Sequence, residues 1–175
     1  MLFRSAPCAS VFGLIGFSGH VGREQEQIDL LESVAHAYGD DWWFNAVHAF
    51  GLMESGQRDA ARPKIERGMA QNPRNANAAH IRAHMFYEDG ELDGARAFIR
   101  GWLPDYTRDG QLHGHISWHL AQCELIAGNL DEAFRLYHEN VSLPVYQGSA
   151  LMVIADAVSF LWRAELAGAP RDESQ

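Results

Sequence analysis

The chain has 175 residues, of which 47% are hydrophobic. This composition provides for a folded core and excludes a wholly disordered chain. The formal net charge is -9 and no dense run of Lys and Arg occurs, so we expect no nucleic-acid partner, because binding to a phosphate backbone needs clustered positive charge. We expect no membrane partner either, because no apolar segment reaches the roughly 20 residues of a bilayer-spanning helix.

The first predicted elements are helices over 7–17 and 23–38. The apolar stretch 9–17 follows Arg4 and loosely resembles a signal peptide, but glycines interrupt it and no clear cleavage site follows. We therefore interpret it as a packing helix. The two cysteines, Cys8 and Cys123, lie far apart and outside any CxxC pair. Cys123 falls in an apolar helical stretch, which predicts a buried, reduced thiol and a cytoplasmic location.

Three glycines, Gly56, Gly90 and Gly128, set an internal repeat. The first two are 34 residues apart, which is the tetratricopeptide period, and the next two are 38 apart, which we attribute to a longer loop over 104–110. Small, acidic and bulky residues recur at fixed distances from these glycines: Ala49, Ala83 and Ala121; Ala61, Ala95 and Ala133; Asp59, Asp93 and Asp131; Ile65, Ile99 and Tyr137. Four residues before each glycine stand Leu52, Phe86 and then Glu124, which breaks its column.

Each column has a physical cause. A glycine suits the left-handed turn between two helices, and an aspartate in a first turn faces the positive end of the helix dipole. Alanine lets paired helices approach closely, and the bulky residue fills the gap between hairpins. The pattern predicts the pairs 42–55 with 57–71, 75–89 with 91–103, and 112–127 with 129–141, then a last helix over 149–167. Asn129 and Glu132 are expected to form a capping box, and Pro63 to bend its helix.

These elements predict an all-α fold: a right-handed superhelix of antiparallel helical hairpins, tetratricopeptide-like, with about eight to nine helices. We expect a single domain over 1–175. Its repeat units are predicted over about 42–75, 76–113 and 114–147, with flanking helices within 7–38 and 149–167.

Several stretches carry a more specific resemblance. Residues 48–56 (HAFGLMESG), 72–76 (NPRNA), 80–84 (HIRAH) and 115–121 (HISWHLA), with the tail 156–166, resemble the tetratricopeptide repeat protein 38 family. The resemblance covers about 9–168, in order. It implies a helical repeat fold and no established activity, and the chain is expected to correspond to the central portion of the longer family members.

The first helix of each hairpin is predicted to line a concave groove, with groove-facing positions 13, 10 and 6 residues before the turn glycine. The ligand-binding floor predicted from this frame is aromatic and rich in imidazole: Trp43, Phe50, Asn77, His80, His84, His115, Trp118 and Gln122. The simpler interpretation of Trp43, Trp118 and Trp162 is core packing, and the alternative is an aromatic binding surface. This floor favours a protein or peptide partner, since aromatic residues are frequent in binding hot spots.

His80 and His84 are four residues apart, a spacing that can chelate a metal ion, and His115 could supply a third ligand. The simpler interpretation is that these rings bond to neighbouring groups in a polar groove. His119 aligns with apolar positions and is expected to be a buried ring. Asp156 stands among apolar residues, so it needs a partner, for which a histidine of the preceding first helix is a candidate.

The sequence thus favours a binding scaffold with no catalytic residue and no cofactor, taking a peptide, a protein segment or a small ligand. The alternative is a metal-dependent or acid–base enzyme that uses His80, His84 and His115 with zinc or another transition metal. No phosphate-binding loop, nucleophile elbow or zinc-finger spacing is present in the sequence. The apolar segment 11–17 and the helix 149–167 also suggest a homodimer formed through exposed terminal helices.

Overall fold

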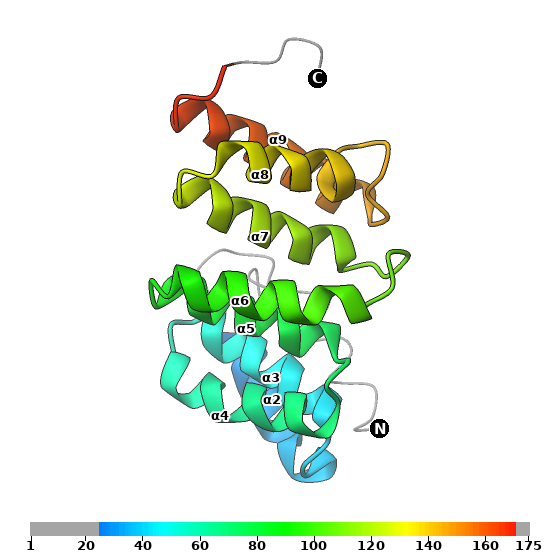
Figure 1. The fold of residues 1–175 in the computed structure, drawn as a ribbon. Coiled ribbons are helices and arrows are strands. Elements are labelled where there is room, and N and C mark those ends of the chain that lie inside the picture. The colour runs from blue at the N-terminus through cyan, green and yellow to red at the C-terminus, as the bar shows by residue number, and fades with distance from the viewer. Residues whose placement is uncertain (1–24, 171–175) are drawn as a thin grey trace. The chain divides into compact units, whose positions relative to one another are not determined.

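The structure, a computed structural model, describes residues 25–170, and every regular element in that range is helical (Figure 1). The α-helices are α2 (Gln25–Tyr38), α3 (Trp42–Glu54), α4 (Arg58–Gln71), α5 (Ala76–Glu88), α6 (Leu92–Trp102), α7 (His113–Ile126), α8 (Leu130–Leu136) and α9 (Ala150–Leu166). A 3₁₀ turn, η3 (Leu103–Asp105), and a π-helical turn, η4 (Tyr137–Val141), complete the set. The predicted all-α, tetratricopeptide-like fold is confirmed, while the helix predicted over 7–17 lies outside the described residues.

The chain divides into two compact units, Met1–Met85 and Phe86–Gln175. The division falls inside α5. The expectation of one domain with three repeat units stays a prediction. Within the described residues, no helix is both long enough and apolar enough to cross a membrane.

The first unit is built on α2, α3 and α4. Leu31 and Val34 of α2 pack with Phe44 and Val47 of α3 in a buried cluster, which joins the two helices. The start of α3 is fixed by Asp41, whose carboxylate accepts a hydrogen bond of 2.8 Å from the backbone N–H of Phe44. This cap satisfies a donor that a helix N-terminus otherwise leaves unpaired.

The three turn glycines have the left-handed backbone that the repeat predicts. Their φ angles are 77° at Gly56, 74° at Gly90 and 80° at Gly128. The backbone N–H of the residue after each glycine donates a hydrogen bond to a carbonyl of the preceding helix, as from Gln57 to Leu52 at 2.8 Å. The same bond follows Gly90 and Gly128. Each hairpin is therefore closed by one recurring turn that only glycine adopts without strain.

The other columns are also confirmed. All six alanines are buried, at most 2% exposed. The bulky column, Ile65, Ile99 and Tyr137, is buried to a similar degree. The three aspartates lie in the first turns of α4, α6 and α8. Small residues therefore lie where helices pack closely, and large ones fill the space between them.

The second unit contains α6 to α9, and its core is aromatic. Tyr137 of η4 stacks on Phe160 of α9 with ring centroids 4.8 Å apart, and Phe134 meets the same ring edge-on. The helix predicted over 129–141 is a short α8 followed by η4. The capping box predicted at Asn129 is wrong: its side chain makes no cap bond and donates instead to Glu124 at 2.7 Å. The buried carboxylate outcompetes the cap for the amide.

Candidate functional site

The predicted groove residues of the first unit do not share one environment. Trp43 is partly buried and packs against the α2–α3 core, 6.4 Å from Tyr38 between ring centroids. Phe50 lies 6.1 Å from the ring of His80. Asn77 is exposed at the start of α5. Only Phe50 therefore joins the α5 histidines, and Trp43 acts at least in part as a packing residue.

His80 and His84 form a direct pair on α5. Their Nε2 atoms are 2.7 Å apart, so one ring donates the hydrogen bond and the other accepts it. On the far side of His84, Nδ1 lies 4.0 Å from Glu54 Oε1. A carboxylate beside one ring nitrogen favours a proton on that nitrogen. The lone pair of the other nitrogen can then accept a hydrogen bond or bind a metal ion. The i, i+4 spacing thus brings two imidazole nitrogens together at half-buried positions.

His48 on α3 is a different kind of histidine. It is only 4% exposed, and neither ring nitrogen has a hydrogen-bond partner within residues 25–170. Burial, and secondarily the charge of Lys64, lower its pKa to about 4. The ring meets Phe44 edge-on at 5.7 Å, so it behaves as a neutral aromatic packing group.

The predicted groove residues of the second unit gather on α7. His115 and Trp118 stack in parallel, with centroids 5.5 Å apart and planes 8° apart, and the guanidinium of Arg163 lies 5.7 Å from the Trp118 ring centroid. Trp118 Nε1 and Gln122 Nε2 are both buried, and neither has an acceptor among the described residues. Two donors one helical turn apart are thus left without the bonds that buried polar groups usually make.

Behind this surface, Asp156 of α9 organises a small network. It is buried, and its Oδ2 lies 2.8 Å from His115 Nδ1 and accepts a 2.8 Å hydrogen bond from the Tyr146 hydroxyl. The predicted histidine partner of Asp156 is therefore confirmed. Burial first, and then the Asp156 charge, raise the pKa of Tyr146, so the phenol stays a donor and fixes the carboxylate that orients His115.

Sequence reasoning missed Tyr146, but a signal exists in Gly114. A Cβ at that position would overlap the Tyr146 ring, so the glycine admits the ring against the start of α7. His119, predicted to be a buried ring, is 7% exposed and meets His115 edge-on at 4.8 Å. Its burial is confirmed.

Cys123 on α7 is a free, buried thiol, as predicted. Burial raises its pKa to about 11. A thiol of such high pKa is neutral at physiological pH and a poor nucleophile, so Cys123 is a packing residue.

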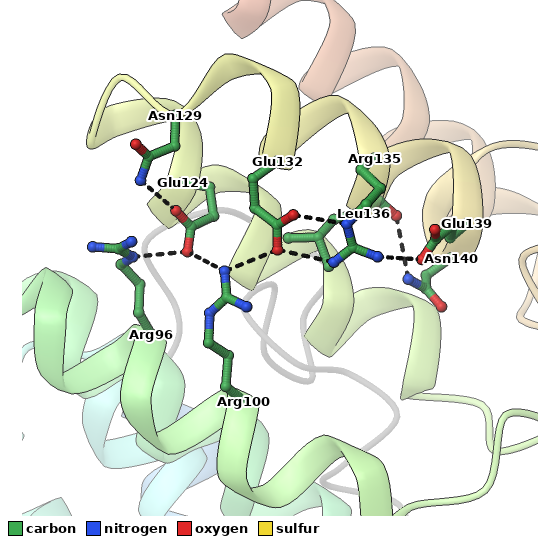
Figure 2. Close-up of polar contacts among 9 residues, drawn as sticks. All are labelled: Arg96, Arg100, Glu124, Asn129, Glu132, Arg135, Leu136, Glu139 and Asn140. Carbon is green, nitrogen blue, oxygen red and sulfur yellow. Dashed lines mark hydrogen bonds and ion pairs between the residues drawn. The ribbon is translucent and has the colours of Figure 1, made fainter.

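Glu124, the residue that breaks its column, is the centre of a charged ladder across α6, α7 and α8 (Figure 2). Its carboxylate accepts hydrogen bonds from Arg96 and Arg100 at 2.8 Å and from Asn129 at 2.7 Å. Burial alone would raise the pKa of Glu124, but these bonds lower it below its usual value. The side chain thus stays ionised although it is fully buried.

The ladder continues outward from Arg100 to Glu132 at 2.9 Å (Figure 2). Hydrogen bonds from Arg135, and then from Arg100, lower the pKa of Glu132 to about 2. Arg135 also pairs with Glu139 one turn further along. Arg96 and Arg100 are four residues apart and lie one above the other on α6. In the sequence, this spacing is the feature that could have indicated a buried acidic partner such as Glu124.

Comparison with known proteins agrees with the repeat frame. Residues 49–110 match the family model described as the tetratricopeptide repeat. No solved structure matches the chain. The more specific likeness to the tetratricopeptide repeat protein 38 family stays a prediction. Tetratricopeptide arrays are helical scaffolds whose surfaces mediate protein interactions. The match, the all-helical fold and the recurring glycine turns together support a place for this chain in the tetratricopeptide-like superfamily.

Proposed function

We propose that this chain is a binding scaffold that takes an extended peptide or protein segment on the predicted groove face of its first helices. The observation that carries the proposal is the pair of buried donors, Trp118 Nε1 and Gln122 Nε2, which lack acceptors within the described residues. A buried donor without a partner costs roughly 1–3 kcal/mol. A ligand that supplies acceptors recovers this cost.

The main chain of a peptide is a suitable source of acceptors. Its carbonyl groups recur along an extended segment, and the two donors recur along α7 at i, i+4. The parallel stack of His115 and Trp118 adds an aromatic surface beside them, a residue type typical of binding hot spots. Orientation of His115 by Asp156 keeps this surface rigid, which lowers the entropic cost of binding. A small ligand with several carbonyl groups would meet the same donors.

Selection from a random peptide display library on the full chain tests this proposal. Affinities of the selected peptides are then measured by fluorescence anisotropy. Trp118→Phe keeps the ring and removes the N–H, and Gln122→Leu removes the amide, so each is expected to weaken binding about tenfold, the effect of one buried hydrogen bond. Gln122→Leu should not lower the melting temperature, since its donor has no acceptor among residues 25–170. Trp118→Phe also removes part of the ring that packs on His115, so Gln122→Leu is the cleaner test.

Gln111→Leu is the matched control, because Gln111 is exposed and lies before α7 begins. It should leave every peptide affinity unchanged. A library that yields no specific peptide, or peptides whose affinities ignore Trp118 and Gln122, would contradict the proposal.

A specific observation also favours the alternative, a metal-dependent or acid–base enzyme. The Nε2 atoms of His80 and His84 already lie 2.7 Å apart, so a small outward movement would let both bind one zinc or other transition-metal ion at about 2.0–2.1 Å. Glu54 lies near Nδ1 of His84, and Asp156 bonds to Nδ1 of His115. A carboxylate at this nitrogen is the usual arrangement that orients a metal-binding imidazole. The sequence assigned His115 as the third ligand.

Zinc titration of untagged protein by calorimetry tests this alternative. His80→Ala and His84→Ala should each abolish binding tighter than about micromolar, and His115→Ala tests the third assignment. His36→Ala, on α2, is the control. Wild-type protein without a site of at least micromolar affinity would eliminate the metal-dependent version.

We further propose that the partner surface includes a second copy of the chain. The outer face of α9 carries a stripe of exposed apolar side chains: Leu151 82%, Ile154 54%, Val158 60%, Trp162 61% and Leu166 71% exposed. Such a stripe can pair with its own copy about a two-fold axis. Light scattering should show a concentration-dependent dimer that Val158→Glu removes; a monomer at high concentration would refute it. The buried, reduced Cys123 is compatible with the proposed cytoplasmic location.

A further inference from the structure

The extra residues between Gly90 and Gly128 form a separate folded segment in the second unit. Its extra residues form η3 and the loop that leads to His113. Tyr106 in this loop packs between Trp102 at 5.0 Å and the ring of His113 at 6.4 Å, and lies nearly parallel to the latter. A Cβ at Gly110 would overlap Tyr106, so the loop folds back closely on its own tyrosine. Insertions in helical repeats map to loops that frequently bind ligands.

This loop forms one side of a cavity of about 340 Å³. The volume lies within the range of roughly 300–1,000 Å³ found for small-molecule sites. Leu103 and Pro104 of the insertion and Leu120 of α7 supply an apolar wall. Arg100, Arg108 and His113 supply basic groups. The cavity thus combines an apolar wall with positively charged or basic side chains, and it shares no residue with the proposed peptide-binding face.

The two arginines of the cavity differ in whether an acidic side chain compensates their charge. Arg100 is neutralised by Glu124 and Glu132 at 2.8 and 2.9 Å (Figure 2). Arg108 donates to the Glu139 carbonyl at 2.6 Å and to the amide oxygen of Asn140 at 3.1 Å. Both acceptors are neutral, and Arg108 forms no ion pair within residues 25–170. Its guanidinium is therefore held in place with its charge uncompensated.

His113 is the second unusual group in the cavity. The residue is only 8% exposed, and its ring lines the cavity and stacks beside Tyr106. Burial, and then the Arg108 charge, lower its pKa, so the ring is neutral near pH 7 and offers one N–H donor. A ring N–H that lines the same cavity as an uncompensated guanidinium is suited to receive an oxyanion.

We propose that this cavity binds a small organic acid, with the oxyanion on Arg108 and His113 and an apolar body against Leu103, Pro104 and Leu120. A guanidinium that is already positioned loses little entropy on binding and can make two parallel hydrogen bonds to an oxyanion. The acid group is a carboxylate or a phosphate monoester.

Calorimetric titration of the full chain with phenylacetate and with phenyl phosphate tests the proposal. At least one should bind with millimolar affinity or better, and the tighter of the two identifies the acid group. Phenylacetamide, which has nearly the same shape without the charge, should bind at least about tenfold more weakly, because a charge-assisted hydrogen bond is lost. Ring resonances of Tyr106 and His113 should shift on titration with the acid and stay unchanged with the amide.

Arg108→Gln removes the charge and keeps side-chain donors toward Glu139 and Asn140, so it should weaken acid binding about tenfold. His113→Phe keeps the aromatic packing on Tyr106 and should also weaken it. Arg74→Gln, an exposed arginine of the first unit, is the control. The proposal is overturned if neither acid binds with millimolar affinity or better, if the amide binds equally well, or if Arg108→Gln behaves like Arg74→Gln.

Discussion

His48 in the first unit and Glu124 in the second are both buried on the first helix of a hairpin, and the two units accommodate them in opposite ways. Glu124 keeps its charge, because Arg96, Arg100 and Asn129 all donate to its carboxylate. His48 has no partner for either nitrogen within residues 25–170 and loses its charge instead, with a pKa of about 4. The same fold thus tolerates a buried titratable group either by supplying donors or by removing the proton.

The difference follows from the neighbouring helix. On α6, two arginines one turn apart extend across to α7, so a carboxylate is favoured where the other repeats have Leu52 and Phe86. His48 meets the Phe44 ring of its own helix, and the charged residue of α4 that acts on it is Lys64, a cation that provides no hydrogen-bond acceptor. A repeat position is therefore not apolar in itself; it is apolar where the adjacent helix offers no counter-charge.

Moving the buried carboxylate into the first unit should have the greatest effect on stability. Leu52→Glu places in the first unit the residue that the second unit holds at the same repeat position. Leu52 is 3% exposed, and burying a carboxylate without dedicated donors should cost about 4 kcal/mol or more of unfolding free energy. Urea unfolding monitored by circular dichroism measures it. A loss below about 1 kcal/mol would show that the first unit also supplies partners.

Acidification should destabilise the chain through His48. Its pKa is about 4 in the folded chain against an ordinary 6.5, so the unfolded chain binds the proton first. This group has no effect on stability above pH 6.5. It should reduce the unfolding free energy progressively from pH 6.5 to pH 4, by up to about 3 kcal/mol.

The control for this pH dependence is His48→Leu, which should flatten the stability profile between pH 6.5 and 4. At pH 7 the variant should be as stable as the wild type or slightly more so, because no hydrogen bond of His48 is lost within the described residues. An unchanged slope in the variant would assign the acid sensitivity to other groups.

Removing Glu124 itself should cost less stability than either change above. Glu124→Ala leaves Asn129 without its acceptor and opens a space beside Arg96 and Arg100. We expect a loss of about 2 kcal/mol, below the roughly 3–5 kcal/mol of a fully buried pair, because both arginines reach solvent. The matched control, Glu139→Ala, removes an exposed carboxylate and should change stability by less than about 0.5 kcal/mol. Equal losses in the two would contradict the role of burial.

The turns and columns were predictable from the sequence because their causes are local. A left-handed residue is required at Gly56, Gly90 and Gly128 whatever surrounds the hairpin. The positions of the small and bulky residues follow from helix periodicity. The partner of Asp156 could also be predicted, because a buried carboxylate requires one and the frame placed a histidine-rich helix before it.

Other features depended on residues far apart in sequence. Tyr146 completes the Asp156 network from a loop that the repeat frame does not describe. The groove positions were predicted as one set, yet Trp43 packs on a core and Gln122 is buried. Asn129 fits a capping pattern, and only the folded chain brings the Glu124 carboxylate close enough to take its amide. Local sequence patterns do not reveal such competition.

Backbone conformation and periodicity within one hairpin are local properties. The residue pattern was therefore enough to predict which segments become helices, where the chain reverses, and how small and large side chains alternate. The bonds of Glu124, the lack of a partner for His48 among the described residues, and the uncompensated charge of Arg108 became visible only in the folded chain. Desolvation and hydrogen bonding depend on what surrounds a group in space, and residues far apart in sequence provide those surroundings.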